Sequence, residues 1–250
     1  MRLARMGSLG LLTVLLLAAC NDANSPSETD QELNEDLALV IADAVIEDVQ
    51  QMNLVLGLGG EAATDAALDM AAPPRNFSRT VSFFDEDGDP QDAYNPELTA
   101  SMVIVVSMSG AVERGDWSAS VERNRTLTVT GLLGQETERI WNGFGDATVT
   151  RSHHSDENGD RSYNMTADFV IEDVVRALPR TEHPWPISGQ ITRHVVVTIV
   201  NGPNGDVTHE RTVIITFNGT QFATLLIGDE EFEIDLGARD GERGFRRKGQ

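Results

Sequence analysis

Two short segments of the chain carry clustered carboxylates that could bind a metal ion. The first contains Asp85, Asp87 and Asp89, and the second contains Asp156, Asn158 and Asp160. Carboxylate and amide oxygens are the ligands that calcium prefers in proteins. Each cluster also includes a glycine, and Asp, Asn and Gly are the residues that tight turns select. We therefore expect two hairpin turns, with calcium binding as the alternative.

The calcium alternative departs from the best-known calcium-binding loop. An EF-hand loop has glycine at its sixth position and a bidentate Glu at its twelfth. In both clusters the glycine is fourth, and the twelfth positions hold Pro96 and Ala167. The clusters therefore do not resemble that motif, and the sequence indicates no other cofactor.

Trp185 is the remaining candidate for a ligand contact. It lies between Pro184 and Pro186, whose fixed backbone angles favour an extended segment. Such a segment could present the indole ring for stacking on a ligand. The alternative is that Trp185 fills the core or closes one end of the domain.

The sequence contains no catalytic signature. The H-E-x-x-H, G-x-S-x-G and P-loop motifs are all absent from it. Carboxylates are so numerous that no pair stands out as a general acid and base. The sequence thus favours a non-enzymatic protein and assigns no catalytic residue. A carboxylate-based hydrolase remains an alternative, because such enzymes carry no short motif.

The elements that must position these residues are mostly strands. Between residues 75 and 237, apolar and polar residues alternate, which is typical of antiparallel strands with one buried face. Asn-Gly and Asp-Gly pairs separate these segments at strand-like intervals. We predict an all-β fold, an antiparallel sandwich or barrel of roughly ten to twelve strands.

One amphipathic helix is expected ahead of the strands, over residues 31–58. Apolar residues between Leu33 and Val45 recur at spacings of three and four, and the pattern ends at a glycine cluster. The polar side of this helix is acidic, which favours packing on the domain over lying on a membrane. Residues 59–74, rich in alanine and ending in two prolines, are predicted to be a linker.

The N-terminus reads as an export signal that ends at Cys20. Arg2 and Arg5 precede an apolar run that is shorter than the roughly 20 residues of a spanning helix. Leu17-Ala18-Ala19-Cys20 resembles the lipobox of bacterial lipoproteins. That resemblance implies cleavage after residue 19, acyl chains such as palmitate on Cys20, and a place in the cell envelope.

The residues after Cys20 refine this expectation. Residues 20–30 are polar and suit a flexible tether between lipid and domain. In the lipoproteins that this segment resembles, Asp after the cysteine favours the inner membrane, so Asn21 favours the outer membrane of a Gram-negative cell. Cys20 is the only cysteine, so the chain cannot form an internal disulfide.

The charge of the chain limits its partners. It has 19 basic and 40 acidic residues and a formal net charge of −21. Such a surface repels nucleic acid and anionic head groups. Residues 238–250 are basic and glycine-rich, and we predict a disordered tail there.

These features together predict an acidic, lipid-anchored envelope protein. Its β domain would bind or organise envelope proteins or polymers at the membrane surface. The alternative is a carrier of lipid or another apolar ligand, since a helix laid on a curved sheet can enclose a cavity, by analogy with lipocalins and outer-membrane lipoprotein-insertion factors. A filled interior favours the binding protein, and an open interior favours the carrier.

Overall fold

The computed structural model confirms an antiparallel all-β fold. It describes residues 75–114, 117–153, 161–202, 205–238 and 244–247, together with selected positions between 34 and 52. The predicted signal peptide, tether and linker lie outside these residues. Among the described residues, no helix is both long and apolar enough to cross a membrane.

Eleven strands make up the described domain, within the predicted range of ten to twelve. In chain order they are β1 (Arg75–Phe84), β2 (Pro90–Gln91), β3 (Ser101–Arg114), β4 (Trp117–Thr130), β5 (Glu138–His153), β6 (Arg161–Ala177), β7 (Ser188–Gly202), β8 (Gly205–Thr216), β9 (Phe222–Ile227), β10 (Glu230–Asp235) and β11 (Phe245–Arg247).

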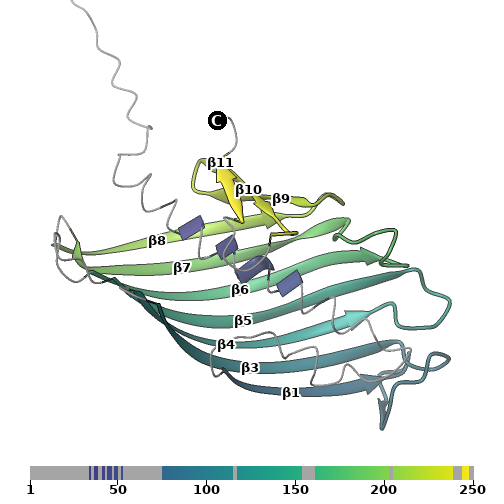
Figure 1. The fold of residues 1–250 in the computed structure, drawn as a ribbon. Helices are drawn as coiled ribbons and strands as arrows, with labels where there is room; N and C mark the ends of the chain where they lie inside the picture. Colours follow the sequence, from purple (N-terminus) through teal and green to yellow (C-terminus); the bar gives the residue numbers. More distant parts are fainter. Residues whose placement is uncertain are drawn as a thin grey trace, which may run out of the picture.

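All eleven strands belong to one sheet, in the order β11-β10-β9-β8-β7-β6-β5-β4-β3-β1-β2. From β3 to β11 each strand pairs with the next along the chain, so the sheet is a meander (Figure 1). Glycines with positive φ stand at predicted turns, namely Gly88, Gly219 and Gly228. The turn chemistry and the period-two pattern therefore account for the strand order.

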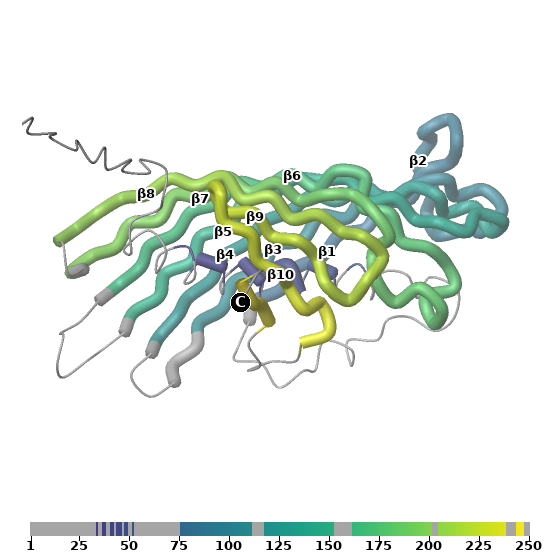
Figure 2. The backbone as a smooth tube through the Cα atoms, turned by 90° about the horizontal axis from the view of Figure 1, so that it is seen from above, coloured from purple at the N-terminus to yellow at the C-terminus, as the bar shows by residue number. Residues whose placement is uncertain are grey.

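The sheet is curved, and its two faces differ (Figure 2). We call the side that holds the buried residues the concave face and the other side the convex face. In β4, for example, Leu127 and Val129 are buried, whereas Thr126 and Thr128 between them are partly exposed. The same alternation continues through β9, where Leu225 is buried and Leu226 is exposed.

Helical residues occupy the concave face. The described positions of the predicted helix are helical and buried, and Figure 1 shows them lying across the sheet. Leu37, Ile41, Val45 and Val49 belong to the same core cluster as the inward side chains of the strands. The described interior therefore consists of helical residues packed against a curved sheet.

Two neighbouring irregularities interrupt the strands. The register shifts in β5 between Trp141 and Gly143, and in β6 between Glu172 and Val175. Asp173 has a φ of 47°, and its backbone N–H donates to Oδ1 of Asn142 at 2.9 Å. The Asn142 amide donates back to the Asp173 carboxylate at 3.1 Å. Irregularities of this kind increase local twist, which helps the sheet to curve.

The C-terminus corrects one prediction. Residues 238–250 were expected to be disordered, but Phe245–Arg247 forms β11 and pairs with β10. Arg246 and Arg247 form ion pairs with Glu233 and Glu230. The prediction failed there because it treated the basic residues as solvated, whereas acidic residues of β10 face them. Residues 239–243 and 248–250 lie outside the described part.

Candidate functional site

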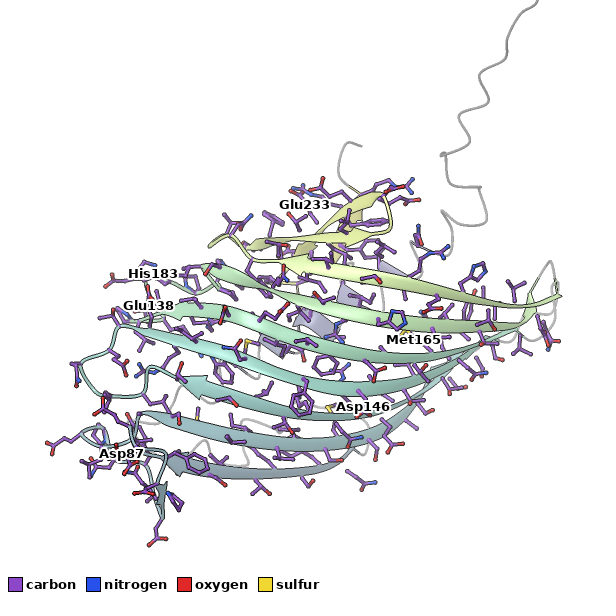
Figure 3. The ribbon with its side chains drawn as sticks, turned by 180° about the vertical axis from the view of Figure 1, so that it is seen from behind. Asp87, Glu138, Asp146, Met165, His183 and Glu233 are labelled. Carbon is purple, nitrogen blue, oxygen red and sulfur yellow. The ribbon has the colours of Figure 1, made fainter. Side chains whose placement is uncertain are left out.

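The first acidic cluster forms a hairpin turn between β1 and β2. Oδ1 of Asp85 accepts hydrogen bonds from the backbone N–H groups of Asp87 (3.1 Å) and Asp89 (2.8 Å). Gly88 has a φ of 83° and donates to the carbonyl of Asp85. Asp87 lies on this turn at a corner of the sheet (Figure 3). The Asp85 carboxylate thus stabilises its own turn, as the turn interpretation predicts.

The other metal candidates are dispersed or outside the described part. Asp156, Asn158 and Asp160 lie outside the described residues, so calcium binding there stays a prediction. Within the described residues, no group of three or more His, Cys, Asp or Glu side chains could hold a metal ion. Cys20 also lies outside the described residues.

Trp185 lies in the connection between β6 and β7. It is partly buried and packs against the core. Its neighbour Pro184 accepts a 2.7 Å hydrogen bond from the fully buried guanidinium of Arg176. Arg139, in register with Arg176 on β5, donates to the carbonyl of Glu138 at 3.1 Å and also to that of Gly131. These two arginines thus bind backbone carbonyls at this end of the sheet.

Charge is segregated between the two faces of the sheet. By register, every arginine whose side chain is described in β1–β8 belongs to the concave face. The described acidic side chains of the same strands belong to the convex face, for example Glu122, Asp146, Asp168 and Glu210. Among the described side chains of β1–β8, the acids therefore lie on the outer face and the arginines on the inner face.

The arginines of the concave face gather in two adjacent rows of the register. One row contains Arg79, Val106, Arg125, Gly145, Phe169 and Arg193. The next contains Met108, Arg123, Ala147, Ala167, Val195 and Arg211. Arg123, Arg125 and Arg193 are buried, at 5%, 3% and 2% exposure.

A single carboxylate from the helical segment joins two of these arginines. Oδ1 of Asp48 accepts a hydrogen bond from Arg125, and Oδ2 accepts one from Arg193, both at 2.5 Å. Asp48 is itself 1% exposed. We call Arg125, Asp48 and Arg193 the clamp. A further bond of 3.4 Å joins Arg211 to Asn34 of the same helical segment.

Gly145 and Phe169 stand between Arg125 and Arg193 in the register, and they leave room for both arginine side chains to reach Asp48. Arg125 and Arg193 stand on β4 and β7, whose backbones are about 14 Å apart at three strand spacings. A Cβ on Gly145 would lie 2.5 Å from Cζ of Phe169, so only glycine leaves room for this ring. The guanidinium of Arg193 lies over the Phe169 ring, 4.7 Å from its centre. Both long side chains thus reach Asp48 from strands on either side of Gly145 and Phe169.

Burial and two neighbouring arginines disfavour the charged form of Arg193, whereas the Asp48 carboxylate favours it. Burial lowers the pKa of Arg193 to about 10; the Asp48 carboxylate opposes this shift, while Arg123 and Arg125 add to it. A pKa of about 10 still leaves Arg193 protonated at neutral pH. The Nε atoms of Arg125 and Arg193 are buried without a hydrogen-bond partner among the described residues. The clamp is therefore a buried cationic centre that one carboxylate only partly satisfies.

The sequence interpretation missed the clamp, although a signal was present. Arg123 and Arg125 alternate in phase with Leu127 and Val129, which predicts the buried face for all four. Asp48 is three residues after Val45, so it falls on the apolar stripe of the helix. Charged residues in phase with apolar ones were the signal to follow.

The convex face carries an exposed apolar row. In register across six strands lie Val105, Thr126, Phe144, Val170, Thr192 and Ile214. Leu226 of β9 extends the row. Phe144 is 63% exposed and its direct neighbour Val170 is 47% exposed. The next row contains Asp146 (Figure 3), Asp168 and His194. Nε2 of His194 lies 2.7 Å from a carboxylate oxygen of Glu210.

Comparison of the chain with protein-family models, with curated proteins and with solved structures finds no match.

Proposed function

We propose that this chain is a lipid-anchored protein of the bacterial envelope whose β domain binds a partner protein without catalysis. The anchor is supported by the lipobox-like segment that ends at Cys20. The binding role is supported by one observation above all, the apolar row across the convex face. An apolar row that continues over several strands is a common mark of an interaction surface.

The charged side chains beside the apolar row indicate what kind of partner would bind there. Asp146 and Asp168 stand beside Phe144 and Val170, and His194 is the only described basic side chain of β1–β8 on this face. Aromatic contact combined with charge complementarity favours a protein surface that carries apolar and basic side chains. The same charges disfavour nucleic acid.

The filled interior supports a binding protein over an open carrier. Helical residues such as Leu37, Ile41 and Val49 occupy the concave face, with 1–3% exposure. The convex face is thus the surface of this sheet that is available to a macromolecule.

The anchor is tested by metabolic labelling. Cells that express the chain and receive labelled palmitate should yield a labelled product, which fractionates with the outer membrane. A Cys20→Ser variant should carry no label and should leave the membrane fraction. A parent chain without label, or a variant retained like the parent, would refute the anchor.

The binding surface is tested by placing a photoreactive amino acid at position 144 in living cells. We expect one main adduct, whose crosslinked peptide is rich in Lys or Arg. Asp146→Asn with Asp168→Asn should reduce its yield at least threefold. Thr208, exposed at the far end of the same face, is the matched control position. Equal yields at positions 144 and 208, or no effect of removing the acids, would contradict the proposal.

A further inference from the structure

Among the described residues, the interior of the domain holds more positive than negative charge. The buried charged residues among those described are Asp48, Arg123, Arg125, Arg139, Arg176 and Arg193. Arg139 and Arg176 bind backbone carbonyls, so they have a structural role. Arg125 and Arg193 belong to the clamp and Arg123 stands in the adjacent row, and among the described residues Asp48 is the buried carboxylate there. Burying unbalanced charge is costly, and apolar residues of similar size are often at least as stable.

The clamp has capacity for more anionic oxygens than it holds. Asp48 uses one oxygen for each arginine, and the Nε atoms of Arg125 and Arg193 remain without a partner among the described residues. A guanidinium offers five N–H donors in a fork that matches carboxylate and phosphate. An anion of that kind could therefore bind the same two arginines with more hydrogen bonds.

Apart from the arginines, the concave face around the clamp is largely apolar. Buried aliphatic and aromatic side chains extend on both sides of it, and the described residues of the helical segment cover them. Those residues take no part in the strand pairing of the sheet. Removing the helical segment would break no strand pairing, so the sheet can persist while its occupant changes.

We propose that the concave face is a binding site for an anionic amphiphile, for which the helical segment is the resident substitute. The carboxylate or phosphate of the ligand takes the place of Asp48 between Arg125 and Arg193. Its acyl chain takes the place of the apolar helix side chains. This site is distinct from the convex face, and it does not depend on the anchor at Cys20.

The competing explanation is that the clamp only fixes the register of the helix. Both explanations predict that single changes in the clamp destabilise the fold. They differ in ligand binding, because a purely structural clamp gives the domain no preference for an anionic amphiphile over a neutral one of equal length.

The test uses the full chain with Cys20→Ser, so that acylation plays no part. Oleate, oleoyl lysophosphatidic acid and oleyl alcohol are titrated below their aggregation concentrations, and heat and hydrogen exchange are measured. We expect an anionic ligand to bind at least tenfold more tightly than oleyl alcohol and to speed exchange in residues 34–52. Preference for oleate assigns a carboxylate ligand, and preference for the lysophospholipid assigns a phosphate.

Three variants separate the two explanations. Asp48→Asn weakens the resident occupant, so oleate affinity should rise. The combined change Asp48→Leu, Arg125→Met, Arg193→Met keeps a packed interior and should remove the preference for an anion. Arg176→Gln, the matched control, removes a buried arginine outside the clamp and should leave the preference unchanged. Equal binding of oleate and oleyl alcohol by the parent, or no binding of either, would overturn the proposal.

Discussion

The concave and convex faces of this sheet are built from the same strands and have opposite chemistry. Along β4, Arg123 and Arg125 point inward to a cationic, apolar interior, whereas Glu122 and Asn124 belong to the outer surface. The inner face is covered by helical residues, and the outer face exposes Phe144 and Val170. The same strands thus present two surfaces of different chemistry, for which we propose two different ligands.

The difference shows why net charge is a poor guide to what a domain binds. The sequence carries a formal charge of −21, from which we expected it to repel anionic groups. The described acids lie on the outer face and the described arginines on the inner face, so the expectation can apply to the outside only. Successive side chains of a strand point to opposite faces. An arginine and an acid that are neighbours in sequence can therefore lie on opposite sides of the sheet.

The largest effect is expected from Asp48→Asn. This change leaves Arg125 and Arg193 buried without a carboxylate, and breaking a buried ion pair costs about 3–5 kcal/mol. Urea unfolding should show a loss of that size in the free energy of unfolding, seen as a lower midpoint with the slope unchanged. A loss below about 1 kcal/mol would mean that water or another group already solvates the clamp.

Replacing all three clamp residues by apolar ones also tests whether unpaired buried charge causes the loss of stability. With Asp48, Arg125 and Arg193 all replaced by Leu or Met, no charge is left unpaired there, and stability should return to within about 1 kcal/mol of the parent or exceed it. If the combined variant were as unstable as Asp48→Asn, packing rather than charge would explain the clamp.

Gly145→Ala should have the next largest effect. The new Cβ would clash with the carbonyl oxygen of Asn124 and lie 2.5 Å from Cζ of Phe169, which supports Arg193. Overpacking of this kind costs about 1–3 kcal/mol. Thermal unfolding measures the loss, with Thr148→Ser on the convex face of the same strand as the control. A neutral Gly145→Ala would show that β5 and β6 move apart easily.

Much of this fold could be predicted from the sequence, because alternation and turn residues act locally. The strand character of residues 75–237, the number of strands and the turns at Gly88, Gly219 and Gly228 follow from such signals. The choice of a single curved sheet does not, since it depends on how the strands meet in space. β11 was missed because its stability comes from the facing acids of β10 and not from its own three residues.

The clamp could be predicted only in part. Its arginines are in phase with buried positions, yet the pairing with Asp48 joins residues 77 and 145 positions apart in sequence. The apolar row on the convex face depends on register across six strands, which alternation within one strand does not specify. Sites assembled from one residue per strand leave little trace in sequence spacing.

β11 also combines a largely buried ion pair with an exposed one. Arg247 pairs with Glu230 and lies over the ring of Phe232, and both charged side chains are largely buried. Arg246 pairs with Glu233 and is 65% exposed. We expect Arg247→Gln to cost about 1–2 kcal/mol and Arg246→Gln less than about 0.5 kcal/mol. Equal losses in urea unfolding would remove the distinction.

The smallest effect on stability is expected on the convex face, where we predict the largest effect on binding. Phe144→Thr removes an exposed aromatic from a cross-strand pair with Val170, and such pairs contribute about 0.2–1 kcal/mol. Thr fits a strand as well as its neighbours Thr126 and Thr148 do. Partner binding should fall at least tenfold in a pulldown from membranes, because truncating a central aromatic contact often removes that much affinity. A variant that is as stable as the parent and still binds would show that the row is only an exposed part of the sheet.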